Sequence, residues 1–141
     1  MLNVSFTGLK GLSDPQNQVI LKNMGTSFKE DFTIPAREVF EKIDEASGQN
    51  DVFVKLSENN IIQVSSNRIV KQYNIDLKNE KGKTLASTFI RFQAGSQSGK
   101  AKQINSENCK KALYGLEEAY ISKYTKGKVS NDIEYMINRF A

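Results

Sequence analysis

The segment from Arg68 to Gln93 constrains the fold of this 141-residue chain more than any other. Two stretches in which apolar and polar residues alternate, 68–77 and 84–93, flank the short polar sequence 79–82 (Asn-Glu-Lys-Gly). Glycine can take a positive φ where a chain must turn sharply, so the pattern predicts a long β-hairpin. Such a hairpin needs a hydrophobic core on at least one face, which other parts of the chain must supply.

The predicted hairpin carries basic and aromatic side chains of the kind that bind nucleic acids. They are Arg68, Lys71, Tyr73, Lys78, Lys81, Lys83, Phe89, Arg91 and Phe92. Cations neutralise phosphates and flat rings stack on bases, although the same residues could equally be divided between core and solvated surface. Ile90 and Phe92 alternate with Phe89 and Arg91. If the first pair fills the core, the second pair is free to meet a ligand.

The rest of the chain is predicted to alternate between strands and helices. The clearest helix is 34–47, in which Thr33 can cap, Pro35 suits the first turn and Gly48 ends the helix. Its acidic residues follow the polar side of the apolar stripe, so we interpret them as a solvated face. We expect strands at 2–7, 18–22, 26–33, 52–56 and 61–65, a flexible linker at 94–103, a long helix at 106–124 and a short amphipathic helix near the end.

Composition argues against catalysis and against a bound metal or cofactor. The chain has no His and a single Cys, Cys109, which removes the commonest general base, the commonest metal ligand and any zinc site of ordinary type. The carboxylates are scattered or lie on the outer face of a helix, where they do not form an acid–base pair. We therefore expect a non-catalytic protein with no cofactor and no metal site.

Charge and targeting signals indicate the partner and the compartment. The net charge is +4, and residues 94–128 alone hold seven Lys against three Glu, which favours a polyanionic partner. No apolar stretch is long enough to cross a bilayer. The first residues lack the features of a secretory signal, and a lone Cys fits a reducing compartment. These features predict a cytoplasmic protein with no membrane partner.

Strands, one mid-chain helix and further strands follow the element order of an oligonucleotide-binding (OB) barrel. Several residues near the N-terminus resemble the opening of bacterial single-stranded DNA-binding proteins: Met1, Leu2, Asn3, Val4, Thr7, Gly8, Leu12, Asp14 and Pro15. Tyr73, the 79–83 turn and Phe92 are similar to the last long hairpin of that family. The resemblance implies an α+β fold with an antiparallel OB-like β-barrel over residues 1–104, and a helical extension over 105–141 packed on the same domain. It suggests an accessory member of the family carried by a conjugative plasmid or phage.

The chain departs from that family in three respects, one of which is that the four strands predicted after the mid-chain helix exceed the family's usual count. It has no Trp for base stacking, and its C-terminus lacks the family's acidic tip, so recruitment of replication partners is not implied. Two alternatives stay open. A sheet followed by a helix, of the Whirly or coactivator type, would keep the function and change the fold. A protein-interaction or small-ligand-binding α+β module would be favoured by a deep apolar cavity under the 106–124 helix.

The sequence thus predicts a non-catalytic single-stranded DNA-binding protein, with double-stranded DNA, RNA and homo-oligomer formation left open. Lys and Arg would contact phosphates, while Phe and Tyr would stack on bases. The residues predicted to bind nucleic acid are Arg68, Lys71, Tyr73, Phe89, Arg91, Lys100, Lys102 and Lys10.

Overall fold

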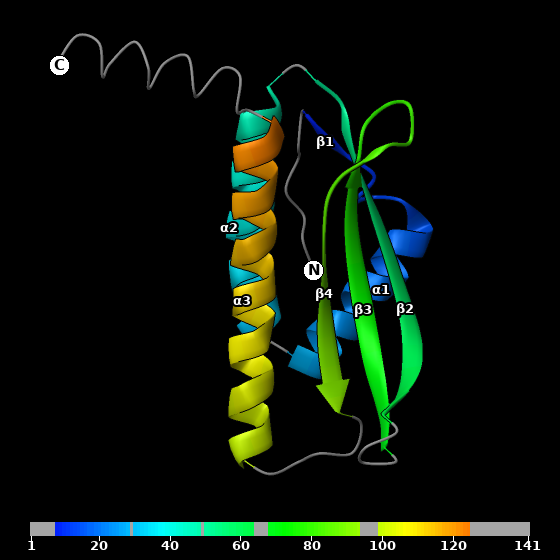
Figure 1. Ribbon diagram of the computed structural model, residues 1–141, viewed down its shortest axis with the longest axis vertical. Coiled ribbons are helices and arrows are strands. Elements are labelled where there is room, and N and C mark those ends of the chain that lie inside the picture. The colour runs from blue at the N-terminus through cyan, green and yellow to red at the C-terminus, as the bar shows by residue number, and fades with distance from the viewer. Residues whose placement is uncertain (1–7, 29, 49, 64–67, 94–98, 125–141) are drawn as a thin grey trace, which may run out of the picture.

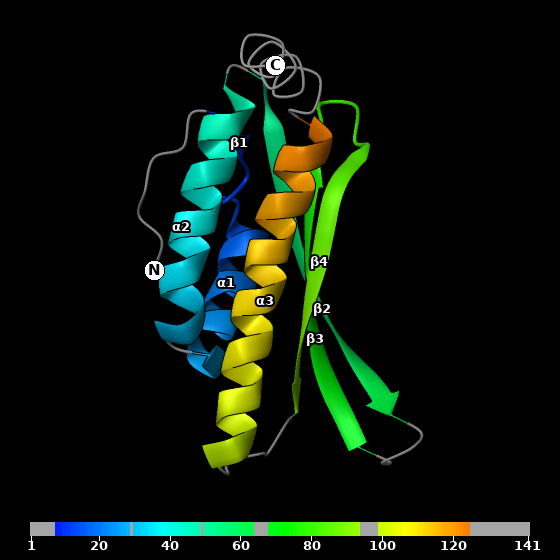
Figure 2. The same cartoon turned by 60° about the vertical axis from the view of Figure 1, so that its left-hand side comes forward.

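The computed structural model describes residues 8–28, 30–48, 50–63, 68–93 and 99–124. One open sheet lies on one side and three helices pack against one of its faces (Figures 1 and 2). Strand order is β1-β2-β3-β4, with β1 parallel to β2 and the other pairs antiparallel. In chain order the elements are β1 (Leu9–Lys10), α1 (Pro15–Phe28), α2 (Glu30–Ser47), β2 (Val52–Gln63), β3 (Arg68–Lys78), β4 (Thr84–Gln93) and α3 (Gly99–Tyr124).

The long hairpin predicted from the sequence is confirmed as β3 and β4. Asn79 organises its turn, because its backbone N–H donates to the Lys83 carbonyl and its Oδ1 accepts from the N–H groups of Lys81 and Lys83, all at 2.9 Å. Gly82 has a φ of 81°, which a residue with a Cβ rarely adopts. The turn residues therefore fix the register between β3 and β4, which decides which of their side chains lie side by side on each face of the sheet.

One hydrophobic core lies between the sheet and the helices. Alternate residues of each long strand face it, including Val54 and Leu56 of β2, Ile75 of β3 and Ile90 of β4. The helices contribute apolar stripes at helical spacing, which confirms the core predicted for the long helix. The residues of α3 that are fully buried in this core are Cys109, Leu113, Leu116 and Tyr120.

Side chains complete the β2 edge of the sheet where β1 ends. The buried Asn17 of α1 donates through Nδ2 to the carbonyls of Gly11 and Val54, both at 2.8 Å, and its Oδ1 accepts from the Leu56 N–H at 3.0 Å. The amide thus acts like the backbone of a neighbouring strand. On α2, Asp44 accepts the backbone N–H groups of Gly8 and Leu9, so this half-buried carboxylate anchors β1 instead of belonging to a purely solvated face.

Four predictions about the secondary structure are wrong. The strands expected at 18–22 and 26–33 are α1 and the start of α2. Asn17, Leu21 and Met24 share the buried side of α1, and Gly25 lies inside this helix without a turn. The break expected at 57–60 is the middle of β2, because pairing with β3 overrides the weak strand propensity of Ser and Asn. Finally, α2 begins at Glu30, ahead of the expected Thr33 cap, and α3 begins at Gly99, inside the expected linker.

The α+β class is confirmed, and the described strands form an open sheet, so the predicted OB-like barrel is not confirmed. Closure needs more strands than the described residues supply, since the segment expected to form the second and third strands is helical. The boundary predicted between residues 104 and 105 falls within α3, whose side chains belong to the same core as the strands. The predicted strand at 2–7 and the short C-terminal helix lie outside the described residues. Among the described helices, none has the length and apolar character required to span a membrane.

Candidate nucleic-acid interface

None of the described helices packs on the face of the sheet opposite α1, α2 and α3, which we call the helix-free face (Figure 2). Strand residues that alternate with the core positions lie on this helix-free face. The pairing register places them in rows across the sheet. One row is Ser57–Asn74–Phe89, the next is Asn59–Gln72–Arg91, and Lys10–Phe53–Lys78 forms a third row nearer the β3–β4 turn.

An aromatic ring and a guanidinium group lie on β4, at one edge of this face. Phe89 is 50% exposed, although an isolated phenylalanine on a strand would favour burial. The Arg91 guanidinium carbon lies 4.8 Å from the centre of the Phe89 ring, within the range of a cation–π contact. Ile90, between them in sequence, is buried under α3. The sequence left open which of these alternating residues fill the core, and the structure buries Ile90 and exposes Phe89 and Arg91.

Polar side chains continue from Arg91 across the sheet as a hydrogen-bonded ladder. Arg91 Nε donates to Gln72 Oε1 at 2.9 Å, and Gln72 Nε2 donates to Asn74 Oδ1 at 2.6 Å. Asn74 Nδ2 in turn donates to Asn59 Oδ1 at 3.0 Å and to Ser57 Oγ at 3.3 Å. This ladder holds Arg91 over Phe89, and it presents amide donors and acceptors beside the ring.

Basic residues lie on the same face, between the row of Phe89 and the β3–β4 turn. Lys55 is exposed and alternates with the buried Val54, while Lys78 lies in the row of Phe53, a second ring that is 40% exposed. Lys10 belongs to that row as well, and its Nζ lies 4.0 Å from Asp51 Oδ1. Asp76 is the acidic residue in the row of Lys55. The helix-free face thus combines two rings with cations and amides.

The structure brings together only part of the predicted site. Phe89 and Arg91 are adjacent, and Lys10 shares their face of the sheet at a distance. Tyr73 is 1% exposed and lies in the core, so it is not a stacking ring. Lys71 alternates with Gln72, on the helix side of the sheet, where its Nζ lies 4.0 Å from Glu58 Oε2. Arg68 belongs to β3, and Lys100 and Lys102 belong to the first turn of α3, but their side chains are not among the described parts of the structure.

Sequence reasoning missed several residues of this face: Phe53, Lys55, Gln72 and Asn74 were not predicted to contribute. The signal that finds them is alternation combined with register. Once Val52 and Val54 are known to face the helices, Phe53 and Lys55 must face away from them. Without the helix positions, both sides of β2 look equally suitable for the core.

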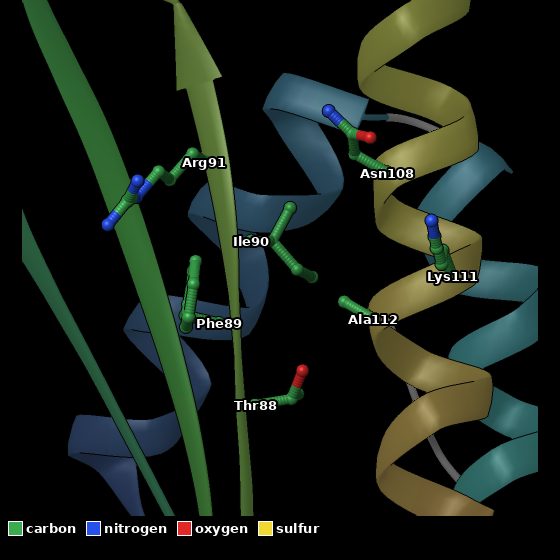
Figure 3. A pocket seen from close by; sticks show the side chains of 7 residues that line it. All are labelled: Thr88, Phe89, Ile90, Arg91, Asn108, Lys111 and Ala112. Carbon is green, nitrogen blue, oxygen red and sulfur yellow. The ribbon is translucent and has the colours of Figure 1, made fainter.

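A groove opens at the β4 edge of the sheet, between this strand and α3 (Figure 3). Its volume is about 360 Å³, near the lower end of the range of small-ligand sites. Thr88 and Ile90 point from β4 toward α3, whereas Phe89 and Arg91 point away from it. The lining residues are Thr88, Phe89, Ile90, Arg91, Asn108, Lys111 and Ala112. Because polar and charged residues contribute to this lining, the groove is not the deep apolar cavity expected for a small-ligand module.

Comparison with known proteins returns no match among family models, curated proteins or solved structures. The resemblance to bacterial single-stranded DNA-binding proteins therefore stays a prediction from the sequence.

Proposed function

We propose that this protein binds single-stranded DNA, without catalysis, on the helix-free face of its sheet. The observation that supports the proposal best is the half-exposed Phe89 ring with the Arg91 guanidinium 4.8 Å from its centre, on the edge strand of a face that also holds unburied cations. A solvent-exposed ring beside a cation is the minimal unit that stacks on a base and pairs with its phosphate.

Each group has a distinct part in the proposed mechanism. Phe89 stacks on one base, and the planar Arg91 guanidinium either stacks on a second base or forms a bidentate contact with a phosphate. Guanidinium carries five N–H donors, so the bond from Nε to Gln72 is compatible with that contact. Lys55 and Lys78 supply further charge for the backbone of the strand. Neither of these two lysines forms an ion pair with any described residue.

The dimensions of the sheet suit a short stretch of extended nucleic acid. Phe53 lies four residues along β2 from Ser57, which belongs to the row of Phe89, and β2 and β4 are two strand spacings apart, with β3 between them. Strand spacing and rise per residue place the two Cα atoms roughly 16 Å apart. A bound strand running diagonally between the two rings would cross β3 in the row of Lys55 and Asp76 and would reach the amide ladder at Phe89.

The test is a fluorescence-anisotropy titration of the full chain with a labelled oligothymidylate, at low and at near-physiological salt. Oligouridylate and a duplex of equal length are compared in parallel. We expect binding at low salt that weakens steeply as salt rises, since phosphate neutralisation releases counterions. Phe89→Ala should weaken binding by about 1–2 kcal/mol, or roughly 5- to 30-fold, because a half-exposed ring gives part of a full stack.

Two matched controls separate the position of a residue from its chemistry. Tyr114→Ala removes an aromatic ring of similar exposure from α3 and should leave affinity unchanged. Lys55→Ala should lower the slope of log affinity against log salt by about 0.7, the value for one phosphate contact with a single strand. Lys110→Ala removes the same charge from an exposed position on α3 and should leave the slope unchanged. Absence of binding at low salt, or equal effects of Phe89→Ala and Tyr114→Ala, would overturn the proposal.

A further inference from the structure

The outer edge of β4 is a long strand edge without a partner strand among the described residues. β4 pairs with β3 on one side and is the terminal strand of the sheet on the other. It is 10 residues long, has no Pro, and carries Arg91 as its one charged residue. Alternate residues of such an edge direct their N–H and C=O groups outward, where another strand can pair with them.

At the opposite edge of the sheet, the outer backbone groups at the start of β2 have partners within the chain. There β1 pairs with Val52 and Phe53, and the Asn17 amide takes over the hydrogen bonds of Val54 and Leu56. The start of β2 is thereby closed by groups within the chain. No comparable device covers β4 among the described residues, and the groove between β4 and α3 leaves room beside it (Figure 3).

We propose that this groove binds an extended, acidic segment of a partner protein, which adds to β4 as a further strand. Main-chain hydrogen bonds to the outer edge of β4 would provide affinity, and α3 would form the opposite wall. The groove adjoins the proposed nucleic-acid interface and shares Phe89 and Arg91 with it, but the inference does not depend on that proposal.

The charge of the groove identifies the chemistry of its occupant. Side chains of an added strand alternate between the two faces of the sheet. Those on the helix side meet Lys111, Asn108 and the small Ala112, while those on the other side meet Phe89 and Arg91. Each side therefore offers a cation to a carboxylate, and none of the described residues that line the groove is acidic. Opposite charges on neighbouring strands stabilise the pair.

The same features disfavour two other occupants. Pairing with the β4 edge of a second copy would bring the cations of this groove toward those of its counterpart, and like charges on neighbouring strands are destabilising. A nucleic acid has no main-chain N–H and C=O groups in the spacing that continues a β-ladder. An acidic peptide satisfies both the ladder and the charges.

The test uses the full chain and a labelled short peptide of alternating valine and glutamate, followed by anisotropy. We expect this peptide to bind, and a peptide with lysine in place of glutamate to bind less. Lys111→Glu should weaken binding about three- to tenfold. Lys110→Glu introduces the same charge change at a neighbouring exposed position outside the groove, and should have no effect. Methylating alternate backbone amides of the peptide should abolish binding, because these amides would donate to the strand edge.

Three results would overturn the inference: no binding of the acidic peptide, equal effects of the two lysine substitutions, or unchanged binding of the methylated peptide. Sedimentation of the chain alone can give a fourth result that overturns the inference. If the chain is a dimer and the variant Ser87→Pro is a monomer, the β4 edge pairs with a second copy instead. Both lysines are exposed, so neither substitution removes buried contacts that the fold requires.

Discussion

Replacing Asn17 by Ala should destabilise the protein far more than a typical polar substitution on a helix. The side chain is 6% exposed and makes three hydrogen bonds, to the carbonyls of Gly11 and Val54 and from the Leu56 N–H. Each bond contributes about 1 kcal/mol net, and each backbone group left buried without a partner adds a desolvation cost. Together these give an expected loss of about 3–5 kcal/mol in the free energy of unfolding.

Urea denaturation followed by far-UV circular dichroism measures this loss. With an m-value of about 2 kcal/mol/M, the midpoint should fall by roughly 2 M. Asn23→Ala is the matched control, because Asn23 lies on the same helix and its amide only approaches Glu58 at 3.4–3.5 Å. The control should change stability by less than about 0.5 kcal/mol. A loss below about 1 kcal/mol for Asn17→Ala would contradict the view that this amide replaces a strand at the β2 edge.

Three further substitutions test how the fold is held together. Asp44→Ala should lower the free energy of unfolding by about 2–4 kcal/mol in urea denaturation, because two backbone N–H groups lose a charged acceptor. Glu45→Ala, at an exposed position, should change it little. Equal losses for the two variants would refute the anchoring role of Asp44. Gly8→Ala should destabilise the chain in the same assay, since a Cβ would lie 2.9 Å from the Gly48 carbonyl oxygen, and wild-type stability would argue against this close approach. Burial raises the pKa of the Cys109 thiol to about 12 from 9.0. The folded state therefore keeps a proton that the unfolded state releases above pH 9, so stability falls as the pH rises from about 9 to 12. Cys109→Ala should flatten that part of the profile of unfolding free energy against pH. An unchanged profile would contradict the burial of the thiol.

Local signals in the sequence were sufficient for the elements that pair or pack with their neighbours. The β3–β4 hairpin follows from alternation around a Gly-containing turn, and the buried face of α3 follows from the spacing of Cys109, Leu113, Leu116 and Tyr120. The predicted exposure of Phe89 and Arg91 followed from alternation once Ile90 was assigned to the core. In each case the period of the side chains and the final burial agree.

Other features depend on contacts that a local pattern does not contain. Gly25 looks like a turn residue, yet packing of Leu21 and Met24 on the sheet keeps the chain helical through it. The polar middle of β2 is a strand because Asn74 bonds Asn59 and Ser57 across the pairing. Lys71 and Tyr73 were assigned to the wrong face for the same reason. The face that the helices cover is decided by tertiary packing and not by the hairpin itself.

The most direct test of the central claim is a nuclear magnetic resonance titration of isotope-labelled protein with a short oligothymidylate. The account predicts that the backbone amides which shift most belong to the strands near Phe89, Arg91 and Asn74, and that resonances on the outer sides of α2 and α3 stay in place. Shifts confined to the helices, or spread evenly over both sides of the molecule, would contradict binding on the helix-free face of the sheet.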